Sequence, residues 1–292
     1  MKFKAAALAL LITLPAVSVA QESKFTITPL TDNLYMLESS AGGNIGLMVG
    51  PDGTFLIDDQ MAPVAKSLME TIENLGGKSP RFLLNTHYHR DHTGGNAAIG
   101  NTSTTIISHD NTRKRLNTET TIHAFNVTNP PASAIALPII TFSETLHLHI
   151  NGETVRNQHF AHAHTDGDSA TFFENANVVH TGDIFFNGLY PFIDTDNGGS
   201  LMGVITAVEK LITSTDANTK IIPGHGPLAN RADLIAYKDM LNFAHTSMRN
   251  MKGSGIAVDE VIALKPMAKY DAKWGQGLFS SDKWIRLIYP SL

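Results

Sequence analysis

The chain has 292 residues, of which 42% are hydrophobic and 17% are charged, and its formal net charge is −5. This composition excludes a disordered chain and predicts one large folded domain or two small ones. The acidic balance argues against a nucleic-acid partner and against binding to an anionic membrane surface. The chain contains no cysteine, so disulfides, thiolate metal ligands and a lipoprotein anchor are not expected.

Residues 1–20 have the pattern of a secretory signal peptide. Two lysines precede an apolar run over residues 5–17, and small residues lead up to a cleavage point after Ala20. The run is too short to span a bilayer comfortably, and no basic stop follows it. We therefore expect a periplasmic or secreted protein without a membrane anchor, in which residues 21–292 form a single domain.

The next part of the chain predicts several short strands and one helix. Residues 25–39 and 44–59 have the pattern of strands joined by turns, with GPDG at 50–53 as a strong turn signal. Helical spacing over 62–76 ends at a glycine, which commonly follows the last turn of a helix. Residues 81–87 then indicate a buried strand that leads directly into a histidine-rich stretch.

The second half of the chain repeats this order. Residues 146–161 hold two apolar runs joined by Asn-Gly, the pattern of a β-hairpin, and 170–183 hold two more short strands. A helix with one apolar face is predicted over 200–213, then a strand with a Gly/Pro-rich turn over 219–227, and a second helix over 231–251. Strands followed by helices, twice over, favour an α/β fold with two packed sheets and helices outside.

Four loops, each directly after a predicted strand, carry the candidate metal-binding side chains. They are HYHRDH at 87–92, AHAHTDGDS at 161–169, HTGDIFF at 180–186 and PGHGP at 223–227. The first loop is either a polar turn that happens to be rich in histidine or part of a metal site completed by the other three. Imidazole nitrogen and carboxylate oxygen suit zinc, and catalytic zinc sites keep one position open for water.

The motif H-x-H-x-D-H, followed in order by histidine, aspartate and histidine, resembles that of the metallo-β-lactamase superfamily of hydrolases. The resemblance covers roughly residues 25–250 and implies a four-layer αβ/βα sandwich with two metal ions at one edge, between the sheets. Zinc is expected, although the ligand types also suit iron and manganese. The implied ligands are His87, His89 and His164 for one ion, Asp91, His92 and His225 for the other, and Asp183 as a bridge between them.

Further residues receive expected roles from their position beside this motif. Asp58 ends a predicted strand, where the family usually has an aspartate, and is expected to orient a ligand loop. Phe186, Asn187 and Tyr190 follow the bridging aspartate and are candidates for the substrate-binding wall. Either Asn187 or Tyr190 is a candidate hydrogen-bond donor to an oxyanion, and core packing is the alternative for the aromatic side chains. Asp91 is also expected to handle the proton that passes to the leaving group.

The resemblance predicts an exported dinuclear zinc hydrolase that opens an amide or ester bond of a small molecule by attack of a metal-bound hydroxide. β-Lactamases are well-known exported members, but their subclasses carry cysteine or serine where Asp183 stands, and one also has a lysine that this segment lacks. Lactonases share the bridging aspartate. The main alternative is therefore a lactonase or another carboxylic ester hydrolase, with β-lactam hydrolysis as a promiscuous activity. A metal-binding protein without turnover is a third alternative.

Overall fold

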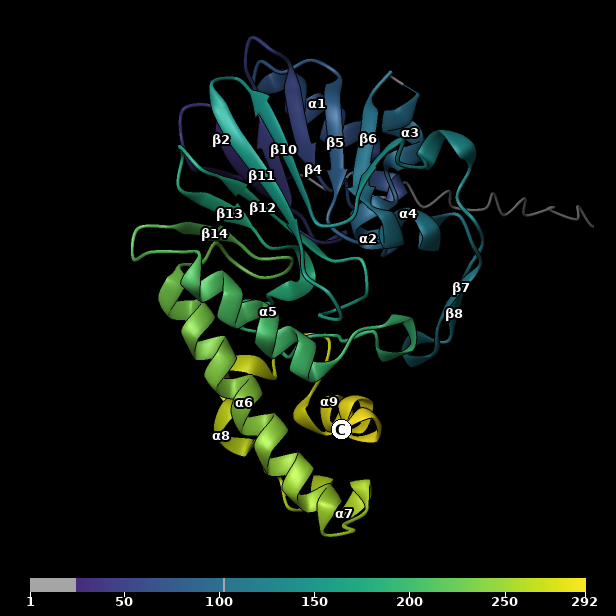
Figure 1. Cartoon of the computed structure of the whole chain (residues 1–292), viewed down its shortest axis with the longest axis vertical. Helices are drawn as coiled ribbons and strands as arrows, with labels where there is room; N and C mark the ends of the chain where they lie inside the picture. The colour runs from purple at the N-terminus through teal and green to yellow at the C-terminus, as the bar shows by residue number, and fades with distance from the viewer. Residues whose placement is uncertain (1–24, 102) are drawn as a thin grey trace, which may run out of the picture.

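The computed structural model describes residues 25–101 and 103–292, so the predicted signal peptide of residues 1–20 lies outside the described part of the chain. Two sheets pack face to face, and helices flank them and extend beyond one end (Figure 1). Among the described helices, none is long and apolar enough to cross a membrane.

The first sheet has seven strands in the order β1-β2-β3-β4-β5-β6-β9. They are β1 (Thr26–Pro29), β2 (Leu34–Glu38), β3 (Ile45–Met48), β4 (Thr54–Ile57), β5 (Pro80–Asn85), β6 (Thr105–His109) and β9 (Ile140–Phe142). Pairing is antiparallel from β1 to β4 and parallel from β4 to β9. Parallel neighbours need crossover connections, which contain α1 (Ala65–Asn74), α2 (Arg90–Thr93), α3 (Asn96–Gly100) and α4 (Asp110–Leu116).

The second sheet has five strands in the order β10-β11-β12-β13-β14. They are β10 (Thr145–Ile150), β11 (Glu153–His159), β12 (Ser169–Phe173), β13 (Val178–His180) and β14 (Lys220–Ile222). Only the last pair is parallel, and α5 (Leu201–Thr213) connects its two strands. A separate hairpin consists of β7 (Thr120–Ile122) and β8 (Val127–Asn129).

The chain beyond β14 is helical. It contains α6 (Arg231–Gly253), α7 (Val258–Ala263), α8 (Ala268–Trp274) and α9 (Ser281–Ile288). Helix α5 packs against α6, and α7 packs against α9, so the C-terminal helices form a group at the lower end of the molecule in Figure 1.

The strands and helices that the sequence predicts are present, with small shifts at their ends. The helix expected over 62–76 begins with a 3₁₀ turn, Ala62–Val64, and ends at Asn74. All six apolar residues on one face of α5 are buried: Leu201, Val204, Ile205, Val208, Leu211 and Ile212. The stretch from 96 to 144, for which no element is predicted, contributes β6 and β9 to the first sheet and supplies the β7–β8 hairpin.

The ligand-bearing loops meet because their strands end at the same edge of the two packed sheets. The Asn44 side chain, next to β3, donates hydrogen bonds to the carbonyls of Pro223 and Gly226 after β14, at 2.9 and 2.8 Å. The backbone N–H of Ser169, at the start of β12, donates to the carbonyl of Thr86 after β5, at 2.9 Å. These hydrogen bonds join the loops of one sheet to those of the other, so the edge is a fixed platform.

Helix α9 holds the loop that follows Asp183 in the sequence. Trp284 is fully buried, its indole Nε1–H donates to the carbonyl of Pro191 at 2.8 Å, and its ring stacks on Tyr190 with centroids 4.8 Å apart. The backbone N–H of Tyr190 also donates to the carbonyl of Trp274 at 2.8 Å. The C-terminal helices therefore fix the position of residues 190–192.

Replacing Trp284 by alanine is expected to lower the free energy of unfolding by about 3–5 kcal/mol, because the truncation leaves a cavity against Tyr190. Urea unfolding followed by circular dichroism measures this change. Lys283→Ala is the matched control, since Lys283 is an exposed neighbour on the same helix, and it should change the free energy by at most about 0.5 kcal/mol. Equal losses in the two variants would contradict the packing role of Trp284.

Candidate metal centre

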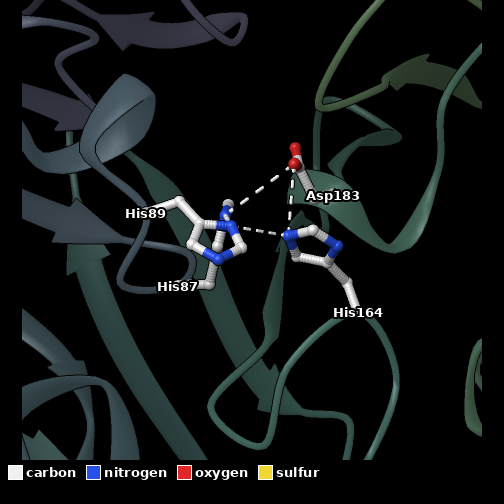
Figure 2. A group of neighbouring side chains, drawn as sticks. All are labelled: His87, His89, His164 and Asp183. Carbon is white, nitrogen blue, oxygen red and sulfur yellow. Dashed lines mark hydrogen bonds and ion pairs between the residues drawn. The ribbon is translucent and has the colours of Figure 1, made fainter. Parts of the chain in front are cut away.

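The four predicted loops bring seven candidate ligands together in two adjoining groups. The first group contains His87, His89, His164 and Asp183, and Figure 2 shows these side chains facing one another. The second contains Asp91, His92 and His225. Within each group one donor atom per residue lies within 4.8 Å of the others. Residues far apart in the sequence thus offer two sets of nitrogen and oxygen atoms at distances that suit a shared ion.

Asp183 lies between the two groups and presents one carboxylate oxygen to each. Its Oδ2 is 3.4 Å from Nε2 of His164 and 3.8 Å from Nε2 of His87. Its Oδ1 is 3.0 Å from Nε2 of His92 and 3.5 Å from Nε2 of His225. This is the arrangement that a carboxylate bridging two ions needs.

Hydrogen bonds on the outer side of the imidazole rings determine which nitrogens face the first group. Nε2 of His89 lies 3.0 Å from Oδ2 of Asp194, and Nδ1 of His164 lies 2.9 Å from the carbonyl oxygen of Phe192. Both oxygens accept, so these nitrogens carry the protons and the opposite nitrogens keep lone pairs. The two lone-pair nitrogens, Nδ1 of His89 and Nε2 of His164, stand only 2.8 Å apart.

Asp58, predicted to orient a ligand loop, is a buried hydrogen-bond acceptor for both groups. Its carboxylate accepts from the backbone N–H and the hydroxyl of Thr86, at 2.8 and 2.7 Å, and from Nδ1 of His92, at 2.7 Å. Because the Thr86 hydroxyl gives its proton to Asp58, Nδ1 of His87, 3.1 Å from that oxygen, must be the donor to it. Nε2 of His87 therefore faces the cluster as a lone pair, and Nε2 of His92 also faces it, 3.0 Å from Oδ1 of Asp183.

Two glycines allow the loops to approach the candidate ligands closely. A Cβ at Gly224 would stand 2.1 Å from Oδ1 of Asp183, and one at Gly43 would stand 2.0 Å from Cε1 of His92. Both distances are far below van der Waals contact. The Gly-rich stretches 39–46 and 223–227 are therefore required for the walls of the cluster to close.

The residues fit a divalent metal ion. The lone pairs of His87, His89 and His164 converge on one another and on Oδ2 of Asp183 with no proton between them. Such an arrangement is repulsive unless a cation lies among the donor atoms. Nitrogen and oxygen ligands whose outer nitrogens are held by carboxylates and carbonyls are the usual environment of zinc and of other divalent transition metals.

Burial keeps two histidines of the first group neutral. Burial lowers the pKa of His87 well below its ordinary value, and it lowers the pKa of His164 to about 4 despite the nearby Asp183. Both imidazoles are therefore deprotonated at pH 7 and ready to bind a metal.

The second group binds protons in the metal-free protein. Burial by itself lowers the pKa of His225, but Asp183 and Asp91 raise it to about 9. Burial also opposes the charged form of His92, yet the same two carboxylates, together with Asp58, raise its pKa well above the ordinary range. The two imidazolium rings in turn hold the pKa of Asp91 below its usual value, although burial raises it.

A cavity of about 340 Å³ opens beside the second group. Asp91, Asp183 and His225 border it, together with His89. Most of the remaining lining is apolar: Met61, Ile122, Phe125, Val127, Phe186, Leu189, Tyr190, Phe192, Leu278 and Phe279. Arg90 is the single cation among the described residues that line it. An apolar cavity with a few convergent polar groups is typical of a small-molecule site.

The three predicted substrate-binding residues differ in position. Phe186 lines the cavity, and its ring stacks on His225 with centroids 5.0 Å apart. The ring of Tyr190 also lines the cavity, but its hydroxyl donates to Asp271 at 2.9 Å. The amide of Asn187 donates to the carbonyl of Pro227 at 3.0 Å, and Asn187 is not among the lining residues. The Tyr190 hydroxyl proton is therefore committed to Asp271, and the Asn187 amide lies outside the cavity lining.

Sequence reasoning missed Asp194, which positions His89. The carboxylate of Asp194 is buried and accepts hydrogen bonds from His89, from the Tyr88 hydroxyl and from the Asn197 amide. The only local signal is an aspartate in the Gly-rich turn DTDNGG, which is also common in ordinary turns. The cavity walls from β7–β8 and from residues 278–279 were missed as well, since only the tertiary fold brings them to the site.

Comparison with known proteins agrees with this architecture. Residues 41–225 match the family model of the metallo-beta-lactamase superfamily. The structure resembles that of a metallo-beta-lactamase from Pontibacter korlensis, with TM-score 0.60, 17% identity and coverage of 75% of this chain and 99% of that one. It also resembles the DIM-1 metallo-beta-lactamase, with TM-score 0.62, 15% identity and coverage of 76% and 100%.

A third similar structure is the stereoselective inverting sec-alkylsulfatase Pisa1 from Pseudomonas sp., with TM-score 0.66, 17% identity and coverage of 91% of this chain and 50% of that one. The search of curated proteins found no match. At these identities the similar structures establish the fold alone, and they confirm the predicted αβ/βα sandwich.

Replacing Asp58 by asparagine is expected to weaken metal binding by about 10- to 100-fold, because an amide cannot accept from Thr86 and His92 as the carboxylate does. Competition with a chromophoric chelator measures the affinity for zinc. Asp239→Asn, on the exposed side of α6, is the matched control. Equal affinities in the Asp58 variant and the parent would contradict the positioning role of Asp58.

Metal binding to the second group at pH 7 is expected to release protons, because the pKa of His92 is raised well above its ordinary value and that of His225 is raised to about 9. Raising the pH toward that value removes this competition, so the apparent affinity for the second ion should increase with pH. Zinc titration calorimetry in buffers of different ionisation enthalpy counts the protons, and we expect roughly one to two per chain at pH 7. Binding of two ions without proton release would contradict these pKa directions.

Proposed function

Because the chain belongs to the metallo-β-lactamase superfamily, we propose that this hydrolase uses two divalent ions to open an amide or ester bond of a small molecule. Asp183 carries the proposal, since it presents one oxygen to each of the two groups of candidate ligands beside an open cavity. We propose zinc for both positions, and the same ligand types also suit iron and manganese.

The ligand assignment follows the two groups. The first ion would be held by His87, His89 and His164, the second by Asp91, His92 and His225, and Asp183 would bridge them. Bound there, the two metal ions would supply Lewis acidity and a hydroxide nucleophile at neutral pH.

The side chains of the cavity would position the substrate and manage the proton. Asp91 borders the cavity, its side chain is 36% exposed, and its Oδ2 is 3.2 Å from Nε2 of His225. It is therefore the cavity carboxylate that would relay a proton to the leaving group, although the neighbouring imidazolium rings lower its pKa in the metal-free protein. The apolar walls, including Phe186, exclude bulk water from the scissile bond and so strengthen the electrostatic interactions around it.

Two substrate classes are open to such a site. A β-lactam is the first, and it is supported by the export pattern of residues 1–20 and by the similar β-lactamase structures. Its carboxylate would pair with Arg90, since residues 184–192 contain no cation. A lactone or another carboxylic ester is the alternative, favoured by a largely apolar lining that provides one cation among its described residues. A non-catalytic metal-binding protein is a remote third candidate, because an open cavity adjoins both groups.

We also propose that the protein acts outside the cytoplasm. The support is the pattern of residues 1–20, with cleavage after Ala20. A periplasmic or secreted location gives the enzyme access to small molecules that reach the cell from outside.

The zinc-loaded protein is expected to hydrolyse a chromogenic cephalosporin or a p-nitrophenyl ester, and Asp91→Asn should lower kcat/KM by about 100-fold or more, because it removes both a metal ligand and the proton carrier. A cephalosporin kcat/KM at or above about 10⁴ M⁻¹s⁻¹ would support a dedicated β-lactamase. A value several orders of magnitude lower, beside faster ester or lactone turnover, would support the alternative. Turnover of none of these substrates, with two ions bound, would contradict the proposal.

A further inference from the structure

We propose that the preferred substrate carries an extended apolar arm, alkyl or aryl, that lies between the β7–β8 hairpin and the loop before α9 while the scissile bond lies at the metal centre. This inference rests on the proposed function, because it concerns the substrate class of the same site. The apolar arm is recognised by residues outside the four ligand loops.

Exposed apolar side chains are concentrated at the mouth of the cavity. Met61, Phe125, Val127 and Leu278 are large hydrophobic residues with relative exposures of 38% to 66%, and all four line the cavity that Asp91 and Asp183 border. Leaving such side chains in water is unfavourable unless a ligand covers them. Their shared position marks one continuous apolar surface that leads from solvent to the candidate ligands.

An aromatic wall connects this mouth to the metal centre. It consists of Phe125, Phe192 and Phe279, which come from three separate segments. The Phe125 ring lies 4.8 Å from that of Phe192 and 6.1 Å from that of Phe279. The ring of Phe192 in turn lies 5.6 Å from that of His89. An apolar arm in contact with this wall would extend outward from the ions.

The residues that line the cavity also argue against a polar substrate arm. Beyond the candidate ligands, its polar members are Arg90, Asn129 and Tyr190, and the hydroxyl of Tyr190 is already bonded to Asp271. A sugar or peptide side arm would leave many hydrogen bonds unmade against these walls. A carbon chain or ring loses nothing there and gains by leaving water.

The test uses zinc-loaded protein and p-nitrophenyl esters of acetate, butyrate and octanoate below their micellar concentrations. We expect kcat/KM to rise by about threefold for each added methylene until the cavity is filled. Leu278→Ser should lower the octanoate-to-acetate ratio of kcat/KM by about fivefold. Leu264→Ser is the matched control, because Leu264 is 62% exposed, compared with 66% for Leu278, and does not line the cavity. The Leu264→Ser variant should have the same octanoate-to-acetate ratio of kcat/KM as the parent protein.

A binding measurement separates this inference from the proposed function. The neutral fluorophore N-phenyl-1-naphthylamine should bind the zinc-loaded protein, and octanol should displace it more strongly than butanol. The Leu278→Ser substitution should weaken the binding of this fluorophore. If neither the esters nor a chromogenic cephalosporin is hydrolysed while these binding results hold, the proposed function fails and the arm site is supported. If esters are hydrolysed without dependence on chain length, and the Leu278 and Leu264 variants bind the fluorophore equally, the arm site is overturned and the hydrolase stands.

Discussion

The burial of Asp183 among imidazole nitrogens is the constraint on which the rest of the site depends. A carboxylate that is 5% exposed, with one oxygen lacking a hydrogen bond, is unfavourable in a protein interior without positive charge beside it. His92 and His225 supply that charge beside Oδ1 in the metal-free protein, because nearby carboxylates raise their pKa. His87 and His164 cannot supply it beside Oδ2, because burial lowers their pKa. Thr86, held by Asp58, and the carbonyl of Phe192 bind the outer nitrogens of these two rings, so their lone pairs face Oδ2. The arrangement is favourable once cations bind among these donor atoms.

The candidate ligands could be predicted from the sequence because coordination chemistry restricts the residue types and the strand ends restrict their location. Four of the seven lie within 87–92, directly after β5. The loop at 161–169 contains two histidines, His162 and His164, and its position after a strand does not distinguish between them. His162 has a positive φ of 56° and its Nδ1 is 3.0 Å from the carbonyl of Gly198, whereas His164 is fully buried at the cluster. The family resemblance implied His164 as a ligand, and His164 is the histidine of this pair that lies among the candidate ligands.

The cavity walls could not be predicted, because they arise from tertiary contacts between distant segments. Tyr190 was one of two candidate hydrogen-bond donors to an oxyanion, because it follows Asp183 closely in the sequence. Its hydroxyl bonds instead to Asp271, which lies 81 residues further along the chain in α8. Phe125 and Leu278 carry no local pattern that marks a binding surface, and they become one only when the β7–β8 hairpin and the loop before α9 meet. Local sequence patterns therefore indicated the candidate metal ligands, but they missed most of the apolar residues that line the cavity.

One residue joins the apolar walls to the metal centre. The ring of Phe192 belongs to the aromatic wall, while its backbone carbonyl accepts the Nδ1 proton of His164. Its neighbour Pro191 accepts the indole proton of Trp284, so α9 fixes the same stretch of backbone. A substrate arm that presses on the Phe192 ring therefore acts on the segment that orients a candidate ligand. Because that segment is held by His164 on one side and by Trp284 on the other, a substrate arm can contact Phe192 closely without moving His164. The apolar walls of the cavity can therefore differ in shape while the candidate metal ligands keep their positions.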